Sequence, residues 1–175
     1  RLGLPRGSRV GVPTWTFIST ALAPYHRGVI PVPLDIDPDT FNLSEHALER
    51  ALDAGLDAVI GVHFGGVPLS RGIHELCASA GVPLIEDAAH ALGATDHRGA
   101  VAGQGTAGCC YSFYATKNLT SAEGGALATD DPELAAFALS FRLHGMSRDA
   151  WARYLPGSAT ATYDILGDGL KANLS

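Results

Sequence analysis

The chain has 175 residues, of which 46% are hydrophobic and 17% charged, and its formal net charge is -6. This composition is typical of a globular domain, and without a basic run it gives no electrostatic reason to expect nucleic acid or an anionic membrane as a partner. No apolar stretch approaches the roughly 20 residues that span a bilayer, and the N-terminus has no signal-peptide pattern, so we expect a cytoplasmic protein. The three cysteines and seven histidines lack metal-ligand spacing, and we expect no metal site.

Short apolar segments alternate with helical segments along the chain. We expect strands at Arg9–Pro13, Val29–Leu34, Ala58–Val62, Val82–Ile85, Cys109–Phe113 and Gly125–Ala128. We expect helices at Thr14–Tyr25, after Asn42, from Ser70 to Gly81, and from Asp131 onward. Strands that are apolar throughout are typical of a parallel sheet covered on both faces. The sequence therefore predicts an α/β fold, a mostly parallel sheet with helices on both faces.

Capping residues and apolar stripes define these helices more closely. Asn42 with Glu45 predicts a capping box, while Ser70 and Gly81 are expected to begin and end the third helix. In the first helix we expect Phe17, Ile18, Ala21 and Leu22 to lie along one side. In the last helix we expect the inward face to consist of Leu134, Phe137, Ala138 and Phe141.

Lys117 lies on the connection between two expected strands. An ammonium removed from water is costly unless it is paired, deprotonated or covalently modified, and irregular connections often carry catalytic groups. These properties favour a chemical role for Lys117. A surface lysine in a loop fits the local pattern equally well.

Several polar residues follow the ends of buried strands. Ligands bind outside the carboxyl ends of the strands in such sheets, so we expect Asp87, His90, His63 and the Ser112–Lys117 loop to converge along one crevice. The alternative for Asp87 is that it caps the loop or the next helix. A carboxylate, a lysine and a hydroxyl on one edge suit pyridoxal phosphate, which needs a Schiff-base lysine, an acidic partner for its ring nitrogen and donors for its phosphate.

Four segments resemble, in order and spacing, the DegT/DnrJ/StrS sugar aminotransferases, which are pyridoxal-phosphate enzymes of fold type I. These segments are Pro31–Asn42, Glu86–Ala94, Ser112–Leu119 and Glu123–Gly125. The resemblance covers nearly the whole chain. It implies that the chain, residues 1–175, is the partial large domain of such an enzyme, without the family's N-terminal phosphate-binding turn and its C-terminal small domain.

The resemblance also implies a role for each candidate site residue. Lys117 would form the Schiff base, Asp87 would keep the pyridine nitrogen protonated, and Ser112 would contact the phosphate. Phe17 would stack on the cofactor ring, and His90 would lie near the cofactor on the Asp87 side. Ordinary core packing is the alternative for Phe17, and a locally hydrogen-bonded loop histidine is the alternative for His90. Many relatives carry glutamine at the position of His90.

The implied function is an aminotransferase that moves an amino group from an amino acid, glutamate by family expectation, to a nucleotide-linked keto sugar. The resemblance implies a homodimer. The alternatives are a relative that binds pyridoxal phosphate without turnover and a truncated fragment that binds nothing. A dinucleotide-binding domain is disfavoured because no Gly-x-Gly-x-x-Gly follows any strand.

Overall fold

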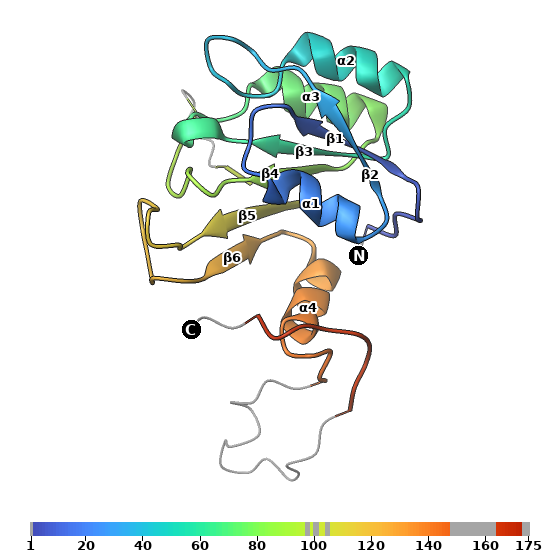
Figure 1. The fold of residues 1–175 in the computed structure, drawn as a ribbon, viewed down its shortest axis with the longest axis vertical. Helices are drawn as coiled ribbons and strands as arrows, with labels where there is room; N and C mark the ends of the chain where they lie inside the picture. The colour runs from blue at the N-terminus through green and yellow to red at the C-terminus, as the bar shows by residue number, and fades with distance from the viewer. Residues whose placement is uncertain (1, 97–98, 100–101, 104–105, 148–163, 173–175) are drawn as a thin grey trace. The chain divides into compact units, whose positions relative to one another are not determined.

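A computed structural model describes residues 2–96, 99, 102–103, 106–147 and 164–172 (Figure 1). The chain divides into two compact units, residues 1–130 and residues 131–175. The described part of the chain contains no helix long and apolar enough to cross a bilayer.

A six-stranded sheet forms the framework of the first unit. Its strands are β1 (Arg9–Pro13), β2 (Ile30–Leu34), β3 (Ala58–Val62), β4 (Leu84–Asp87), β5 (Gly108–Ser112) and β6 (Gly125–Ala128). In the order β2-β1-β3-β4-β5-β6, all neighbours are parallel except β5 and β6, which are antiparallel. The prediction of a mostly parallel sheet is therefore confirmed. The order changes direction between β1 and β3, which marks the carboxyl edge nearby as the expected place for a ligand.

Helices cover both faces of this sheet, as predicted (Figure 1). One face packs against α2 (Glu45–Asp53) and α3 (Arg71–Ala80), and the other lies against α1 (Ser19–His26). The core on the α2 and α3 face includes Leu34, Leu48, Val59, Ile73 and Leu84. The core on the α1 face includes Val10, Val12, Val29, Ala58 and Ile60, with Ala21 from the helix.

The first helix differs from its prediction in where it begins. It begins at Ser19 and not at Thr14, and its buried residues are Thr20 and Pro24. Phe17 and Ile18, expected on the apolar side of the helix, precede it and are 76% and 61% exposed. The predicted start of the helix was therefore wrong, and the side that α1 buries against the sheet contains the polar residue Thr20.

The second helix is capped by Ser44 and not by Asn42. The Ser44 hydroxyl accepts a hydrogen bond from the Ala47 amide at 3.4 Å. The Asn42 side chain instead accepts from the Phe64 amide at 2.8 Å and donates to the carbonyls of residues 67 and 68. Asn42 therefore joins the loop before α2 to the loop that contains the 3-10 turn η1 (Phe64–Gly66).

The predicted ends of α3 are confirmed. The Ser70 hydroxyl accepts a hydrogen bond from the Ile73 amide, and Gly81 adopts a left-handed conformation with φ of 66° at the C-terminus. Strand β4 extends through Asp87, two residues beyond its prediction, and β5 begins one residue earlier than predicted. Asp87 is therefore the last residue of its strand.

The described part of the second unit contains α4 (Pro132–Phe141). Asp131 caps it by accepting hydrogen bonds from the amides of residues 133 and 134, as expected from the sequence. Phe137 stacks on Phe141 with ring centroids 5.5 Å apart, but no side chain of α4 is buried and Phe137 is 45% exposed. Of the predicted inward stripe, Phe137 is exposed, whereas Leu134, Ala138 and Phe141 are half-buried.

Candidate active site

The Asp87 carboxylate is oriented by two hydrogen bonds at the carboxyl end of β4. One oxygen accepts from the Thr20 hydroxyl of α1 at 3.1 Å, and the other accepts from the Ala89 amide at 3.1 Å. Thr20 is 4% exposed, whereas Asp87 is half-buried. The carboxylate is held in one direction and still keeps access to a ligand.

The pairing of β4 with β5 places two further polar side chains on the Asp87 face of the sheet. Asp87 is opposite Cys110 in the parallel register, and Ser112 is two residues farther along β5. Side chains alternate between the faces of a strand, so Asp87, Cys110 and Ser112 share one face. Loss of hydration, followed by the charge of Asp87, raises the pKa of the exposed Cys110 thiol.

Lys117 lies in the turn that follows β5. Its amide donates to the Tyr114 carbonyl at 2.9 Å, and the Tyr114 amide donates to the Ser112 hydroxyl at 3.3 Å. The neighbouring Asn118 donates to the His90 carbonyl at 3.3 Å, so the Lys117 turn is joined to the loop after β4. Within the described residues the half-buried Lys117 forms no ion pair with Asp87, which leaves both groups available to a ligand.

Phe17 and His90 both lie at exposed positions. Phe17 is 76% exposed, so it does not pack in the core formed by the described residues, and its carbonyl accepts from the Thr20 amide at 3.1 Å. His90 follows Asp87 by three residues, and no hydrogen bond of its imidazole is found among the described residues. Both rings are thus accessible near the residues that orient Asp87.

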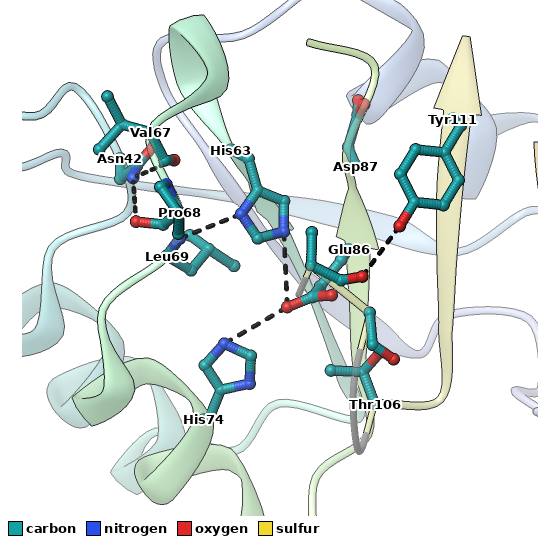
Figure 2. Close-up of polar contacts among 12 residues, drawn as sticks. Asn42, His63, Val67, Pro68, Leu69, His74, Glu86, Asp87, Thr106 and Tyr111 are labelled. Atoms are coloured by element: carbon teal, nitrogen blue, oxygen red, sulfur yellow. Dashed lines mark hydrogen bonds and ion pairs between the residues drawn. The ribbon is translucent and has the colours of Figure 1, made fainter. Parts of the chain in front are cut away.

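His63 does not join this group, contrary to the sequence expectation. Its side chain lies on the opposite face of the sheet, where Nε2 is 3.5 Å from Oε1 of Glu86, and both residues are buried. Figure 2 shows the Glu86 side chain turned toward His63 and His74, with Asp87 turned away from them. The reason is the alternation along β3 and β4, because His63 falls on the same face as Glu86 and not on that of Asp87.

Sequence reasoning missed Thr20 as a site residue. Its hydroxyl donates to Asp87, and the hydroxyl of Thr16, which precedes α1, lies 2.8 Å from the same oxygen. Because the Thr20 proton points to Asp87, Thr16 is the donor in the second bond. The available signal was a pair of threonines four residues apart beside a predicted active-site strand.

The residues at this edge fit pyridoxal phosphate. A carboxylate suits the ring nitrogen, a primary amine suits the aldehyde carbon, and a hydroxyl suits the phosphate. Asp87, Lys117 and Ser112 supply these groups from the ends of two adjacent strands and the turn that follows. An α/β fold with a carboxylate, an amine and a hydroxyl at one edge of its sheet is suited to bind pyridoxal phosphate.

The sequence profile of the DegT/DnrJ/EryC1/StrS aminotransferase family matches residues 1–169. The chain belongs to this family, which confirms the resemblance found in its sequence motifs.

Solved structures of related proteins have the same fold. The aminotransferase TlmJ from Streptoalloteichus hindustanus is 33% identical with a TM-score of 0.83, over 97% of this chain and 43% of TlmJ. DesV from S. venezuelae, solved in complex with a ketimine intermediate, is 32% identical with a TM-score of 0.80, over 97% of this chain and 42% of DesV. DesI, solved in the presence of its TDP-sugar product, is 39% identical with a TM-score of 0.72, over 79% of this chain and 36% of DesI. The chain spans less than half the length of each of these proteins.

Proposed function

We propose that this chain forms the cofactor-binding region of a pyridoxal-phosphate-dependent aminotransferase, which moves an amino group from glutamate to a keto sugar carried by a nucleotide. Membership of an aminotransferase family supports the reaction class. The TDP-sugar product of the related DesI supports the nucleotide-linked acceptor. The observation that carries the proposal is the Asp87 carboxylate, oriented by Thr20 and Ala89 on the sheet edge that continues into the Lys117 turn.

Each site residue then has a specific task. When bound, pyridoxal phosphate supplies an electron sink for the electron pair released as the Cα–H bond of the amino donor breaks. Asp87 stabilises a proton on the ring nitrogen through its negative charge. Lys117 would hold the cofactor covalently and, as a free amine, would take the proton from the donor Cα and deliver it to the former aldehyde carbon of the cofactor.

Three other residues bind and orient the cofactor. Ser112 donates its hydroxyl to the phosphate, and the exposed ring of Phe17 packs on one face of the pyridine. His90 lies beside the ring on the Asp87 side. Because the chain belongs to this family, we also expect the enzyme to be a homodimer. Light scattering of the purified protein would test this expectation.

Borohydride reduction followed by peptide mapping tests the assignment of Lys117. The chain contains two lysines, Lys117 and Lys171, so each can be removed separately. We expect the reduced adduct on Lys117, its loss in Lys117→Ala, and its retention in Lys171→Arg. An adduct on Lys171, or the same adduct yield in Lys117→Ala, would overturn the proposed site.

Addition of glutamate distinguishes an active enzyme from a relative that only binds the cofactor. An active enzyme shifts its visible absorption as the amino group is transferred and releases 2-oxoglutarate. A spectrum that stays unchanged while the Lys117 adduct forms normally would show cofactor binding without turnover.

A further inference from the structure

A second carboxylate, Glu86, lies beside Asp87 in the sequence but on the opposite face of the sheet. It is 0% exposed, and its Oε1 lies 3.5 Å from Nε2 of His63 and 3.3 Å from Nε2 of His74 (Figure 2). His63 is 2% exposed, whereas His74 on α3 is 34% exposed. Glu86 is thus enclosed on the face that α2 and α3 cover, where the proposed reaction does not take place.

Stability alone does not account for this buried carboxylate. Neither of its oxygens receives a well-aligned hydrogen bond from the described residues. Tyr111, a neighbour from β5, donates its hydroxyl to the Ala102 carbonyl and not to Glu86. A buried polar group without hydrogen-bond partners is costly, so the burial of Glu86 calls for a role other than stability.

His63 connects Glu86 to the backbone that carries Asp87. The His63 amide donates to the Asp87 carbonyl at 3.0 Å, and its Nδ1 accepts from the Leu69 amide at 3.0 Å. Because Nδ1 is an acceptor, the ring proton lies on Nε2, the nitrogen that faces Glu86. His63, in the turn after β3, therefore contacts both Glu86 and the backbone of Asp87.

We propose that Glu86 is a positioning residue, which through His63 fixes the direction of the Asp87 carboxylate. Glu86 and Asp87 are consecutive, so holding one side chain on the α3 face fixes the rotation of the strand end and thereby the other side chain on the α1 face. The inference rests on the proposed role of Asp87 in cofactor binding.

The test compares three single-residue variants of the full-length protein. Glu86→Met keeps the length of the side chain but removes the acceptor for His63, whereas Glu86→Gln keeps an acceptor. Leu84→Ala is the matched control, because Leu84 is 5% exposed on the same strand and the same face but does not contact His63 through a polar group. If Glu86→Met fails to fold, the double variant Glu86→Met/His63→Leu is used in its place, because it removes both polar partners together.

Hydrogen exchange of the cofactor-free protein gives the first readout. In Glu86→Met we expect the amides of His63 and Leu69 to exchange at least tenfold faster relative to the amide of Val59, which bonds to the Pro83 carbonyl on the same strand pair. Glu86→Gln should keep this ratio within threefold, and Leu84→Ala should change all three amides together. Equal acceleration of all three amides in Glu86→Met would overturn the proposal. The double variant lacks the His63 imidazole that accepts from the Leu69 amide, so for this variant only the affinity for pyridoxal phosphate is compared.

Titration with pyridoxal phosphate gives the second readout. We expect the dissociation constant to rise at least tenfold in Glu86→Met or in the double variant, to stay within threefold in Glu86→Gln, and to be unchanged in Leu84→Ala. An unchanged constant in Glu86→Met, or an increase in Leu84→Ala as large as that in Glu86→Met, would make Glu86 a core residue without a positioning role.

A parallel titration of Asp87→Asn separates the two proposals. If Asp87→Asn weakens binding but Glu86→Met does not, only the positioning role fails. If Asp87→Asn leaves the affinity and the absorption spectrum of the cofactor unchanged, the proposed role of Asp87 fails, and the positioning role fails with it.

Discussion

Replacement of Thr20 by valine removes one hydrogen bond from Asp87 with little change of shape. The Thr20 hydroxyl, 4% exposed, donates to Oδ2 of Asp87 at 3.1 Å and accepts from Thr16 at 2.8 Å. Valine has nearly the same volume but cannot donate. The Asp87 carboxylate would keep one protein donor, the Ala89 amide.

The expected loss is larger in the cofactor complex than in the free protein. A hydrogen bond to a charged group contributes about 1.5–3 kcal/mol. In the free protein water can replace the Thr20 hydroxyl, because Asp87 is only half-buried. A bound ring excludes that water, so about 1–2 kcal/mol of the loss should appear in cofactor affinity, which corresponds to roughly 5- to 30-fold weaker binding.

Titration of Thr20→Val with pyridoxal phosphate measures this loss directly. Thr16→Val is the control, because it removes a neighbouring hydroxyl that bonds to Thr20 and not to Asp87. We expect the control to change affinity less than threefold. Equal affinities of the wild type and Thr20→Val would refute the argument that the hydroxyl orients the carboxylate toward the cofactor.

Three further predictions concern a glycine of β6 and the three cysteines. In Gly125→Ala the new Cβ would lie 2.6 Å from the backbone oxygen of Tyr111, so we expect a loss of about 1–3 kcal/mol in the free energy of unfolding, measured with urea. Cys110 shares the Asp87 face and is exposed, so bound pyridoxal phosphate should slow its labelling by a thiol reagent at least tenfold, and an unchanged rate would contradict a ring over that face. Burial raises the pKa of Cys77 and of Cys109 from 9.0 to about 11. As the pH rises, the unfolded chain therefore loses these thiol protons before the folded chain does. The free energy of unfolding should fall between pH 9 and pH 11, by up to about 3 kcal/mol for each thiol. Urea unfolding at pH 8 and pH 10.5 should show a smaller decrease in Cys109→Ala than in the wild type.

The sheet could be predicted from the sequence because its strands are short and apolar. The ranges of β1, β3 and β6 were predicted to the residue, and the caps of α3 followed from Ser70 and Gly81. Those signals are local, since a strand buried on both faces needs apolar residues throughout and a left-handed helix end favours glycine. Local signals therefore sufficed for the elements that build the core.

The prediction failed where a side chain serves a distant partner. Apolar periodicity placed Phe17 and Ile18 on one side of a helix, but α1 begins after them and turns Thr20 inward to reach Asp87, 67 residues away. Asn42 likewise resembles a helix cap, but its amide bonds to a loop more than 20 residues ahead. A pattern of neighbouring residues carries no information about such partners.

Glu86 and Asp87 show how two adjacent carboxylates acquire different tasks from the geometry of one strand. A shift of β4 by one residue would exchange their faces, so Asp87 would be buried against the imidazoles and Glu86 would face α1. The observed register has Gly61 opposite Glu86 and Val62 opposite Asp87. In a shifted strand His63 and His74 would face the shorter side chain of Asp87, and Glu86 would be removed from the imidazoles that now face its carboxylate. The buried Glu86 therefore opposes the register shift that would remove Asp87 from the proposed cofactor site, which links the polar group beneath α3 to chemistry on the opposite face.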